Sequence, residues 1–138
     1  MREKTCNLWT ERAEYRCIPT TGATTADGEA ILETRIAREA VQRFNGLAVD
    51  LGRLLTSRGN HVHVIRPGLL SFPVQQFAWG GPSVQVIARS ARELRALVGE
   101  ATVLLPRPGV GEDALAWEVV AKVLSDLPDN VTVVEHAS

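Results

Sequence analysis

A glycine-rich turn follows one apolar strand of the chain and precedes a predicted helix. The run at residues 101–105 is typical of a central strand buried on both faces, residues 106–111 read Pro-Arg-Pro-Gly-Val-Gly, and helical spacing predicts a helix over 113–126. Ligands of an open α/β sheet bind beyond the carboxyl ends of the strands, where a helix N-terminus and close backbone N–H groups favour a phosphate. The turn therefore predicts an anion site, and the alternative is a tight connection that binds nothing.

Asp113 is the acidic group best placed to act in such a site. At the start of a helix its carboxylate would cap the helix or stabilise the helix dipole, which is the interpretation that the residues alone favour. Its alternative role is to hydrogen-bond a ligand hydroxyl or to orient a water molecule. Glu112 has the same two roles with a weaker case. Trp117 is four residues beyond Asp113 and is expected on the same helical face, as core or as a pocket wall.

Two further pairs of side chains have both a chemical and a structural interpretation. His61 and His63 alternate along a strand predicted over 61–65 and so share one face. They could form half of a metal site, but no third ligand is evident, and a surface or structural role is favoured. Arg35 and Arg38 open the first predicted helix, where they either meet a phosphate or lie on a solvated face.

The loop from Gln75 to Pro82 is rich in Gln, Gly and aromatic residues. Phe77 and Trp79 within it could stack on a base or a nicotinamide. Packing of the two rings over the edge of the sheet is an equally good interpretation.

Apolar runs alternate with helical patterns along the chain, which indicates an α/β fold. Strands are predicted over 14–20, 61–65, 69–74, 101–105 and 131–134. Helices are predicted from Ile36 to Phe44, over 47–58, over 84–98 with Ser83 as the N-cap, and over 113–126.

Length and composition indicate one domain, 1–138, and exclude several classes of protein. The net charge of −1 gives no reason to expect electrostatic binding of nucleic acid. No apolar run reaches the roughly 18 residues that span a bilayer, and the polar residues 1–10 do not look like a secretory signal. We therefore expect a cytoplasmic protein in which Cys6 and Cys17 are reduced, with no membrane contact, no metal and no cofactor.

Residues 104–118, Leu-Leu-Pro-Arg-Pro-Gly-Val-Gly-Glu-Asp-Ala-Leu-Ala-Trp-Glu, resemble the second ligand loop of a macrodomain subgroup. That subgroup contains the terminal ADP-ribose–protein glycohydrolase and small bacterial and phage proteins. The form there is an apolar strand, Pro-Arg, a small turn ending in Gly-x-Gly, and then x-Asp-x-Leu-x-Trp. Residues 27–30, 70–74 and 89–94 also look like the bacterial members, so the resemblance extends over about 5–135.

The resemblance implies a three-layer α/β/α sandwich with a central mixed β-sheet, whose ligand cleft lies at the strand ends. Asn7 and Leu8 fall where the family has an Asp-Leu pair whose carboxylate binds the adenine amino group. Asn7 can still accept that hydrogen bond, but without charge. Gly109, Val110 and Gly111 fall on the turn whose backbone holds the diphosphate and the distal ribose.

The same resemblance implies a catalytic position and two departures. Asp113 falls on the carboxylate that assists glycosidic cleavage in the glycohydrolase subgroup. The family's first ligand loop reads Gly-x-Gly-Ile/Val-Ala, but here Thr34, Arg35 and Ile36 put side chains where glycines leave space for the ligand. The nucleophilic lysine of the subgroup is missing, because residues 75–77 read Gln-Gln-Phe and an amide cannot form a Schiff base.

These observations predict a module that binds ADP-ribose, free or attached to a macromolecule, without efficient turnover. One alternative is a hydrolase of ADP-ribosyl groups, or of the phosphate of ADP-ribose-1''-phosphate, in which Asp113 activates water or orients the substrate. The other is a diverged cleft that binds another ligand or a protein partner, which the filled first loop favours.

Overall fold

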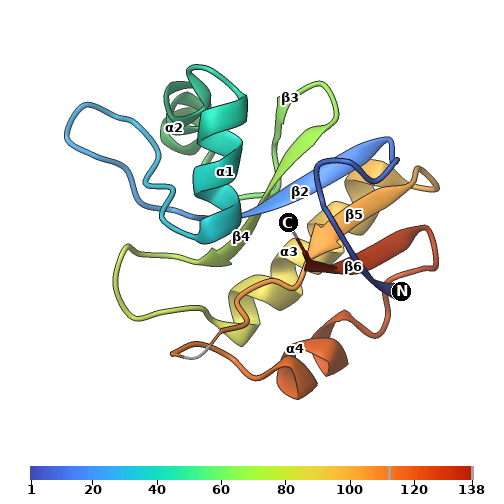
Figure 1. Ribbon diagram of the computed structural model, residues 1–138. Helices are drawn as coiled ribbons and strands as arrows, with labels where there is room; N and C mark the ends of the chain where they lie inside the picture. The colour runs from blue at the N-terminus through green and yellow to red at the C-terminus, as the bar shows by residue number, and fades with distance from the viewer. Residues whose placement is uncertain (112, 138) are drawn as a thin grey trace.

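The computed structural model describes residues 1–111 and 113–137, and a six-stranded sheet runs through its centre (Figure 1). The strands are β1 (Arg2–Cys6), β2 (Tyr15–Thr21), β3 (Val64–Arg66), β4 (Leu69–Gln75), β5 (Val103–Pro106) and β6 (Val131–His136). They lie side by side in the order β1-β6-β5-β2-β4-β3. Neighbouring strands pair in parallel except β3, which pairs antiparallel with β4 at one edge. The expected mixed sheet is therefore confirmed.

Helices cover both faces of this sheet and complete a three-layer α/β/α sandwich. The helices are α1 (Arg35–Arg43), α2 (Leu47–Arg58), α3 (Val84–Val98) and α4 (Trp117–Leu124). In Figure 1, α1 and α2 lie above the sheet, and α3 and α4 lie below it. The predicted fold class is confirmed by this arrangement.

Successive strand residues pack into two different cores because side chains alternate between the faces of a sheet. Ile18 and Leu69 pack in the cluster that contains Ala40 of α1. Their neighbours Cys17 and Leu70 belong to the larger cluster, on the face of the sheet that α3 and α4 cover. Both faces of the central strands are thus buried, which explains why their sequences are apolar runs rather than alternating patterns.

Three helices follow the predictions closely. The helices α2 and α3 begin and end at the predicted residues, and the Ser83 hydroxyl accepts the predicted capping bond from the Val86 N–H at 3.4 Å. The helix α1 begins one residue before the first predicted helical residue. Its N-cap is Thr34, whose hydroxyl accepts a hydrogen bond from the Ala37 N–H at 3.2 Å.

One strand was missed, and two predictions about the elements are wrong. The strand β1 was not expected, because Arg2–Cys6 is mostly exposed and carries charge rather than alternating apolar residues. The strand predicted over 61–65 begins only at Val64, so the two preceding histidines are not strand residues. The helix predicted over 113–126 is α4, which begins at Trp117, and Ala116 before it provides no side-chain cap.

Candidate functional site

A cleft of about 210 Å³ lies where the carboxyl ends of the parallel strands meet. Its walls come from the ends of β2, β4 and β6, from the start of α1 and from the loops that follow β4 and β5. The lining residues are Pro19, Thr34, Arg35, Ile36, Val74, Gln75, Pro82, Arg107, Gly109, Val110, Ala114 and His136. This is the place at which open α/β sheets bind ligands. Its volume is below the roughly 300–1,000 Å³ of common small-molecule sites.

The first wall is the N-terminus of α1. Thr34, Arg35 and Ile36, three of the predicted ligand-binding residues, line the cleft, and the positive end of the helix dipole points toward the space between them and the opposite wall. Arg35 is 63% exposed and forms an ion pair with Glu39 at 3.2 Å, one helical turn away. Arg35 thus lines the cleft with a largely exposed side chain that is paired with Glu39.

The second wall is the turn after β5, where Gly109 and Val110, also predicted to bind the ligand, line the cleft. Gly109 has a φ of +72°, in the left-handed region that favours glycine. A Cβ atom on Gly109 would lie 2.9 Å from both the Ile87 Cδ1 and the Pro82 Cβ. Only glycine fits at this position, so its presence is explained by the backbone of the turn and by the close approach of α3.

Arg107 holds the base of that turn and supplies positive charge to the cleft. Its backbone N–H donates to the Val134 carbonyl at 3.0 Å, and its guanidinium lies 4.5 Å from the centre of the Trp117 ring. The guanidinium also pairs with Glu135 at 3.2 Å and with Glu3 at 3.9 Å. Trp117 thus forms a support for Arg107 rather than a partner of Asp113 on a helical face.

The carboxylate of Glu39, beside the cleft, interacts with three donor groups. Glu39 accepts hydrogen bonds from the Trp9 Nε1 and the His136 Nε2, each at 2.9 Å, in addition to its ion pair with Arg35. Burial alone would raise the pKa of Glu39, but the hydrogen bonds from Trp9 and His136 outweigh it and hold that pKa below its usual value. Glu39 is therefore ionised at neutral pH and fixes the groups around it.

Asn7 and Leu8 are not among the residues that line the cleft. The Asn7 Oδ1 accepts a hydrogen bond from the Trp9 N–H at 2.8 Å, and the Leu8 side chain is fully buried. The Leu8 N–H donates to the His136 Nδ1 at 3.0 Å, and the Leu8 carbonyl accepts from the Arg16 Nε at 2.9 Å. The predicted adenine-binding residues are thus connected to the cleft through His136.

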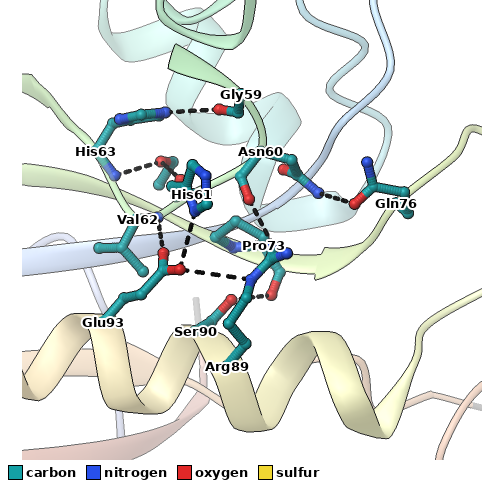
Figure 2. A network of polar contacts seen from close by, with 11 residues as sticks. Gly59, Asn60, His61, Val62, His63, Pro73, Gln76, Arg89, Ser90 and Glu93 are labelled. Carbon is teal, nitrogen blue, oxygen red and sulfur yellow. Dashed lines mark hydrogen bonds and ion pairs between the residues drawn. The ribbon is translucent and has the colours of Figure 1, made fainter.

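A network of polar contacts supports the end of β4 (Figure 2). The Asn60 Nδ2 donates to the Gln75 carbonyl at 3.1 Å and to the Gln76 Oε1 at 3.2 Å. Asn60 is itself held by Arg89 of α3, and the neighbouring Ser90 hydroxyl donates to the Pro73 carbonyl at 2.7 Å. The position at which the resemblance would place a lysine is therefore filled by glutamines in a fixed backbone.

His61 and His63 have structural partners, in agreement with the surface or structural role that the sequence favoured over a metal site. The His61 Nδ1 lies 2.9 Å from the Glu93 Oε2, and the His63 Nε2 lies 2.8 Å from the Gly59 carbonyl. Figure 2 shows both rings directed toward these groups. Among residues 1–111 and 113–137 the structure contains no group of three or more His, Cys, Asp or Glu side chains that could hold a metal ion.

Asp113 and Gly111 lie at the rim of the cleft and do not line it. Both are exposed, and Asp113 occupies a turn in which the Ala114 N–H donates to the Gly111 carbonyl at 3.2 Å. Ala114, the next residue, does line the cleft. Asp113 neither caps a helix nor begins one, so the helix-cap role expected for it is wrong. Glu112, its predicted companion, lies outside the described residues.

Phe77 and Trp79 stack on each other at the surface. Their ring centres are 5.1 Å apart with an angle of 9° between the planes, and the residues are 54% and 73% exposed. They belong to the loop between Gln75 and Pro82, both of which line the cleft. The predicted packing over the edge of the sheet is therefore replaced by a stacked pair that solvent reaches.

Sequence reasoning missed the side chain of His136 and its partner Glu39. The last predicted strand stopped at residue 134, two residues before the end of β6. A single histidine at the end of a mostly buried strand carries no local pattern, and its partners Leu8 and Glu39 are 128 and 97 residues away. Only the topology, which places β6 beside β1 and near α1, could have indicated this cluster.

Comparisons with known proteins identify the fold. No protein-family model matches the sequence, and the search of curated proteins also gives no match. Among solved structures, the macrodomain of Mycobacterium tuberculosis DarG is similar with a TM-score of 0.79 and 18% identity, over 99% of this chain and 97% of that chain. The macrodomain of Thermus aquaticus DarG is similar with a TM-score of 0.75 and 14% identity, over the same shares of the two chains.

A third solved structure, Thermosipho africanus DarTG in complex with ADP-ribose, is similar with a TM-score of 0.73 and 10% identity. The similarity covers 95% of this chain and 41% of that larger chain. At these identities the comparisons establish the architecture. No helix in the described part of the chain is long and apolar enough to cross a membrane. The chain thus has the fold of the macrodomains, with its cleft at the strand ends formed between the loop that begins α1 and the loop that follows β5.

Proposed function

We propose that this protein binds ADP-ribose, or a related ADP-ribosyl nucleotide, in the cleft at the strand ends. The observation that carries the proposal is the juxtaposition of two loops. Thr34, Arg35 and Ile36 at the N-terminus of α1 face Gly109 and Val110 across one cleft. The likeness in fold to Thermosipho africanus DarTG, which was solved in complex with ADP-ribose, supports the same ligand class.

The diphosphate would lie between the two loops. The N-terminus of α1 attracts negative charge through the helix dipole and its outermost N–H groups. The opposite turn brings backbone close to the ligand because Gly109 has no side chain. Arg107, which is 30% exposed and lines the same cleft, adds a positive charge that is already positioned by Trp117 and Glu135.

The adenine end would lie toward the turn that contains Asn7. The Asn7 Oδ1 already accepts one hydrogen bond from the Trp9 N–H and retains a second lone pair for an adenine amino group. Because Asn7 has no negative charge, this hydrogen bond contributes less to the binding free energy than one made by an aspartate. The proposed affinity is therefore that of a binding module rather than of a very tight site.

The absence of a lysine at the end of β4 supports binding without turnover. Gln75 lines the cleft, and its backbone is fixed by Asn60, so a primary amine is missing from the position where the subgroup places its nucleophile. The amide of Gln75 can hydrogen-bond a ribose hydroxyl but cannot form a covalent adduct with the sugar.

A second candidate function is hydrolysis of an ADP-ribosyl bond or of a phosphate on its distal ribose. Asp113 is exposed at the rim, next to the cleft residue Ala114, and so could reach a water molecule at the open end of the cleft. Incubation of the protein with ADP-ribosylated protein, ADP-ribosylated nucleic acid and ADP-ribose-1''-phosphate distinguishes this candidate, because only an enzyme releases ADP-ribose or phosphate with multiple turnovers.

Calorimetric titration with ADP-ribose tests the main proposal, with AMP and NAD as controls. We expect a dissociation constant in the micromolar range, about −8 kcal/mol, and weaker binding of AMP because it lacks the distal ribose and one phosphate. If ADP-ribose at millimolar concentration gives no binding heat and no shift in melting temperature, the side chains of the first loop close the site and the proposal is wrong.

A further inference from the structure

His136 connects three parts of the molecule that meet at the cleft. It is the last residue of β6, and its side chain is only 4% exposed although it lines the cleft. One ring nitrogen, Nδ1, receives the N–H of Leu8, and the other, Nε2, lies 2.9 Å from the Glu39 carboxylate. The ring therefore joins the β1–β2 turn to α1.

These two partners fix the protonation state of the ring. The Leu8 N–H can only donate, so the Nδ1 that receives it must be without a proton. Because Glu39 is an acceptor, Nε2 must carry the hydrogen. The arrangement thus requires the neutral imidazole in its Nε2–H form, even though a neighbouring carboxylate ordinarily favours the charged ring.

The turn that makes this bond is also held by the Trp9 Nε1, which donates to Glu39, and by the Arg16 Nε, which donates to the Leu8 carbonyl. The Asn7 carbonyl accepts from the N–H groups of Thr10 and Glu11, and the Asn7 Oδ1 accepts from Trp9, so these bonds are internal to the turn. The Leu8 side chain is fully buried, and the Leu8 N–H donates to the His136 Nδ1. A second proton on His136 would place two N–H groups face to face at 3.0 Å and push the turn away from the cleft.

We propose that neutral His136 is the positioning residue for the adenine end of the cleft, and that its protonation at Nδ1 releases the Leu8 amide and weakens the binding of ADP-ribose. The effect of pH on affinity rests on the proposed function. The dependence of the turn on His136 does not, because it is a property of the ligand-free protein.

The charged and titratable groups around His136 come from α1, β1, β6 and the turn after β5. Glu39 of α1 contacts the ring through its Oε1, and Arg35 pairs with the Oε2 of the same carboxylate. Arg107 lines the same cleft and pairs with Glu135, the residue before His136. Cys6, the register partner of His136 on β1, has a pKa raised by burial and stays neutral in the range where histidines titrate.

Nuclear magnetic resonance on the ligand-free protein is the first part of the test. Long-range nitrogen–proton spectra should show a proton on Nε2 and none on Nδ1 of His136 near pH 7.5. As acidification adds a proton to Nδ1, the exchange protection of the Leu8 amide should fall in parallel. A proton on Nδ1 at neutral pH, or Leu8 protection that does not follow the titration, would overturn the proposal.

Two substitutions separate the roles of the ring nitrogens. In His136→Asn the amide oxygen replaces Nδ1 as the acceptor for Leu8, whereas in His136→Gln the amide nitrogen replaces Nε2 as the donor to Glu39. We expect His136→Gln to bind ADP-ribose about tenfold more weakly than wild type at pH 7.5, the loss expected for one buried donor left unpaired. His136→Asn should lose less, and its affinity should not vary between pH 8 and pH 5, whereas that of wild type should fall.

His61→Asn is the control for general titration of histidines and should keep the wild-type pH profile, since His61 is bound to Glu93. Circular dichroism establishes that each variant is folded. Equal losses in His136→Asn and His136→Gln, or a wild-type affinity that does not change with pH, would overturn the role of Nδ1. If ADP-ribose binds at no pH, the proposed function fails, and the Leu8 amide still decides whether His136 positions the turn.

Discussion

Substitution of Gly109 by alanine should destabilise the protein by about 2–4 kcal/mol. Two independent costs arise at this position. An L-residue in the left-handed conformation of Gly109 costs about 1–2 kcal/mol. The new Cβ would also lie 2.9 Å from the Ile87 Cδ1 and from the Pro82 Cβ, and overpacking of this kind costs about 1–3 kcal/mol.

One smaller effect opposes these costs. Alanine restricts the unfolded chain more than glycine does, and this offsets about 0.4–1 kcal/mol of the lost free energy of unfolding. Ile87 is fully buried in the core beneath α3, so it cannot move aside without disturbing its neighbours. A loss of 2–4 kcal/mol is smaller than the usual 5–15 kcal/mol of a domain, so the variant should still fold.

Gly111→Ala is the matched control in the same turn. A Cβ on Gly111 would meet only the Ala114 Cβ, at an ordinary 3.8 Å, and Gly111 has no left-handed φ. Its effect should stay within about 0.5 kcal/mol. Urea denaturation of both variants measures the difference, and the melting temperature of Gly109→Ala should fall by about 6–12 °C. Equal unfolding free energies for the two variants would refute the argument that Gly109 is fixed by its conformation and by α3.

Three further predictions concern the site and its support. Arg35→Gly should tighten ADP-ribose binding in calorimetry by about tenfold because it removes a side chain from the 210 Å³ cleft, and weaker binding would mean that Arg35 contacts the phosphate instead. Asp113→Ala should leave ADP-ribose affinity within about twofold, because Asp113 does not line the cleft, but it should abolish any hydrolysis detected by release of ADP-ribose, and unchanged turnover would remove Asp113 from catalysis. Glu93→Gln should cost about 1–2 kcal/mol at pH 7 in urea denaturation, since it weakens charge-assisted bonds to the Val62 N–H and His61. Burial opposes ionisation of Glu93, yet those bonds hold its pKa below the ordinary value of 4.5, so its contribution is present above pH 4.5 and is lost as the pH falls through the lowered pKa. Stability of Glu93→Gln should therefore vary less in acid than that of wild type, and identical acid profiles would contradict this.

The elements that sequence reasoning predicted well are those whose signals are local. Ser83 indicates the start of α3, and the apolar runs of β4 and β5 indicate buried strands. Neighbouring residues alone are sufficient for both predictions, because a helix cap and a doubly buried strand are recognised from short stretches of sequence. The strand β1 has no such signal. Its residues are charged, and it is a strand only because β6 pairs with it at the edge of the sheet.

The start of α4 shows the same limitation at the candidate site. The spacing around Asp113 fits a helix, but the Leu115 N–H donates to the Gly109 carbonyl at 3.0 Å, and Val110 and Leu115 form an isolated β-bridge. A contact between two turns therefore overrides a helical pattern, and it moves Asp113 from a helix start to an exposed turn. Of the nine predicted site residues, the five that line the cleft lie on the two loops that the resemblance identified, whereas the position of His136 depended on topology alone.

The pairing of β1 with β6 affects how the protein folds and opens. Arg2 pairs with Thr132 and Cys6 with His136, so this edge closes a loop of almost the whole chain, and the Leu8 N–H meets the ring of His136 across 128 residues. Contacts of such long range form slowly, because the entropy of closing the loop opposes them before the contacts exist. The edge that carries the Asn7 turn is therefore expected to close late in folding and to open early in native-state fluctuations. A ligand held against that turn would bind the closed state alone, so it would slow hydrogen exchange along β1 although it touches none of the five residues of that strand.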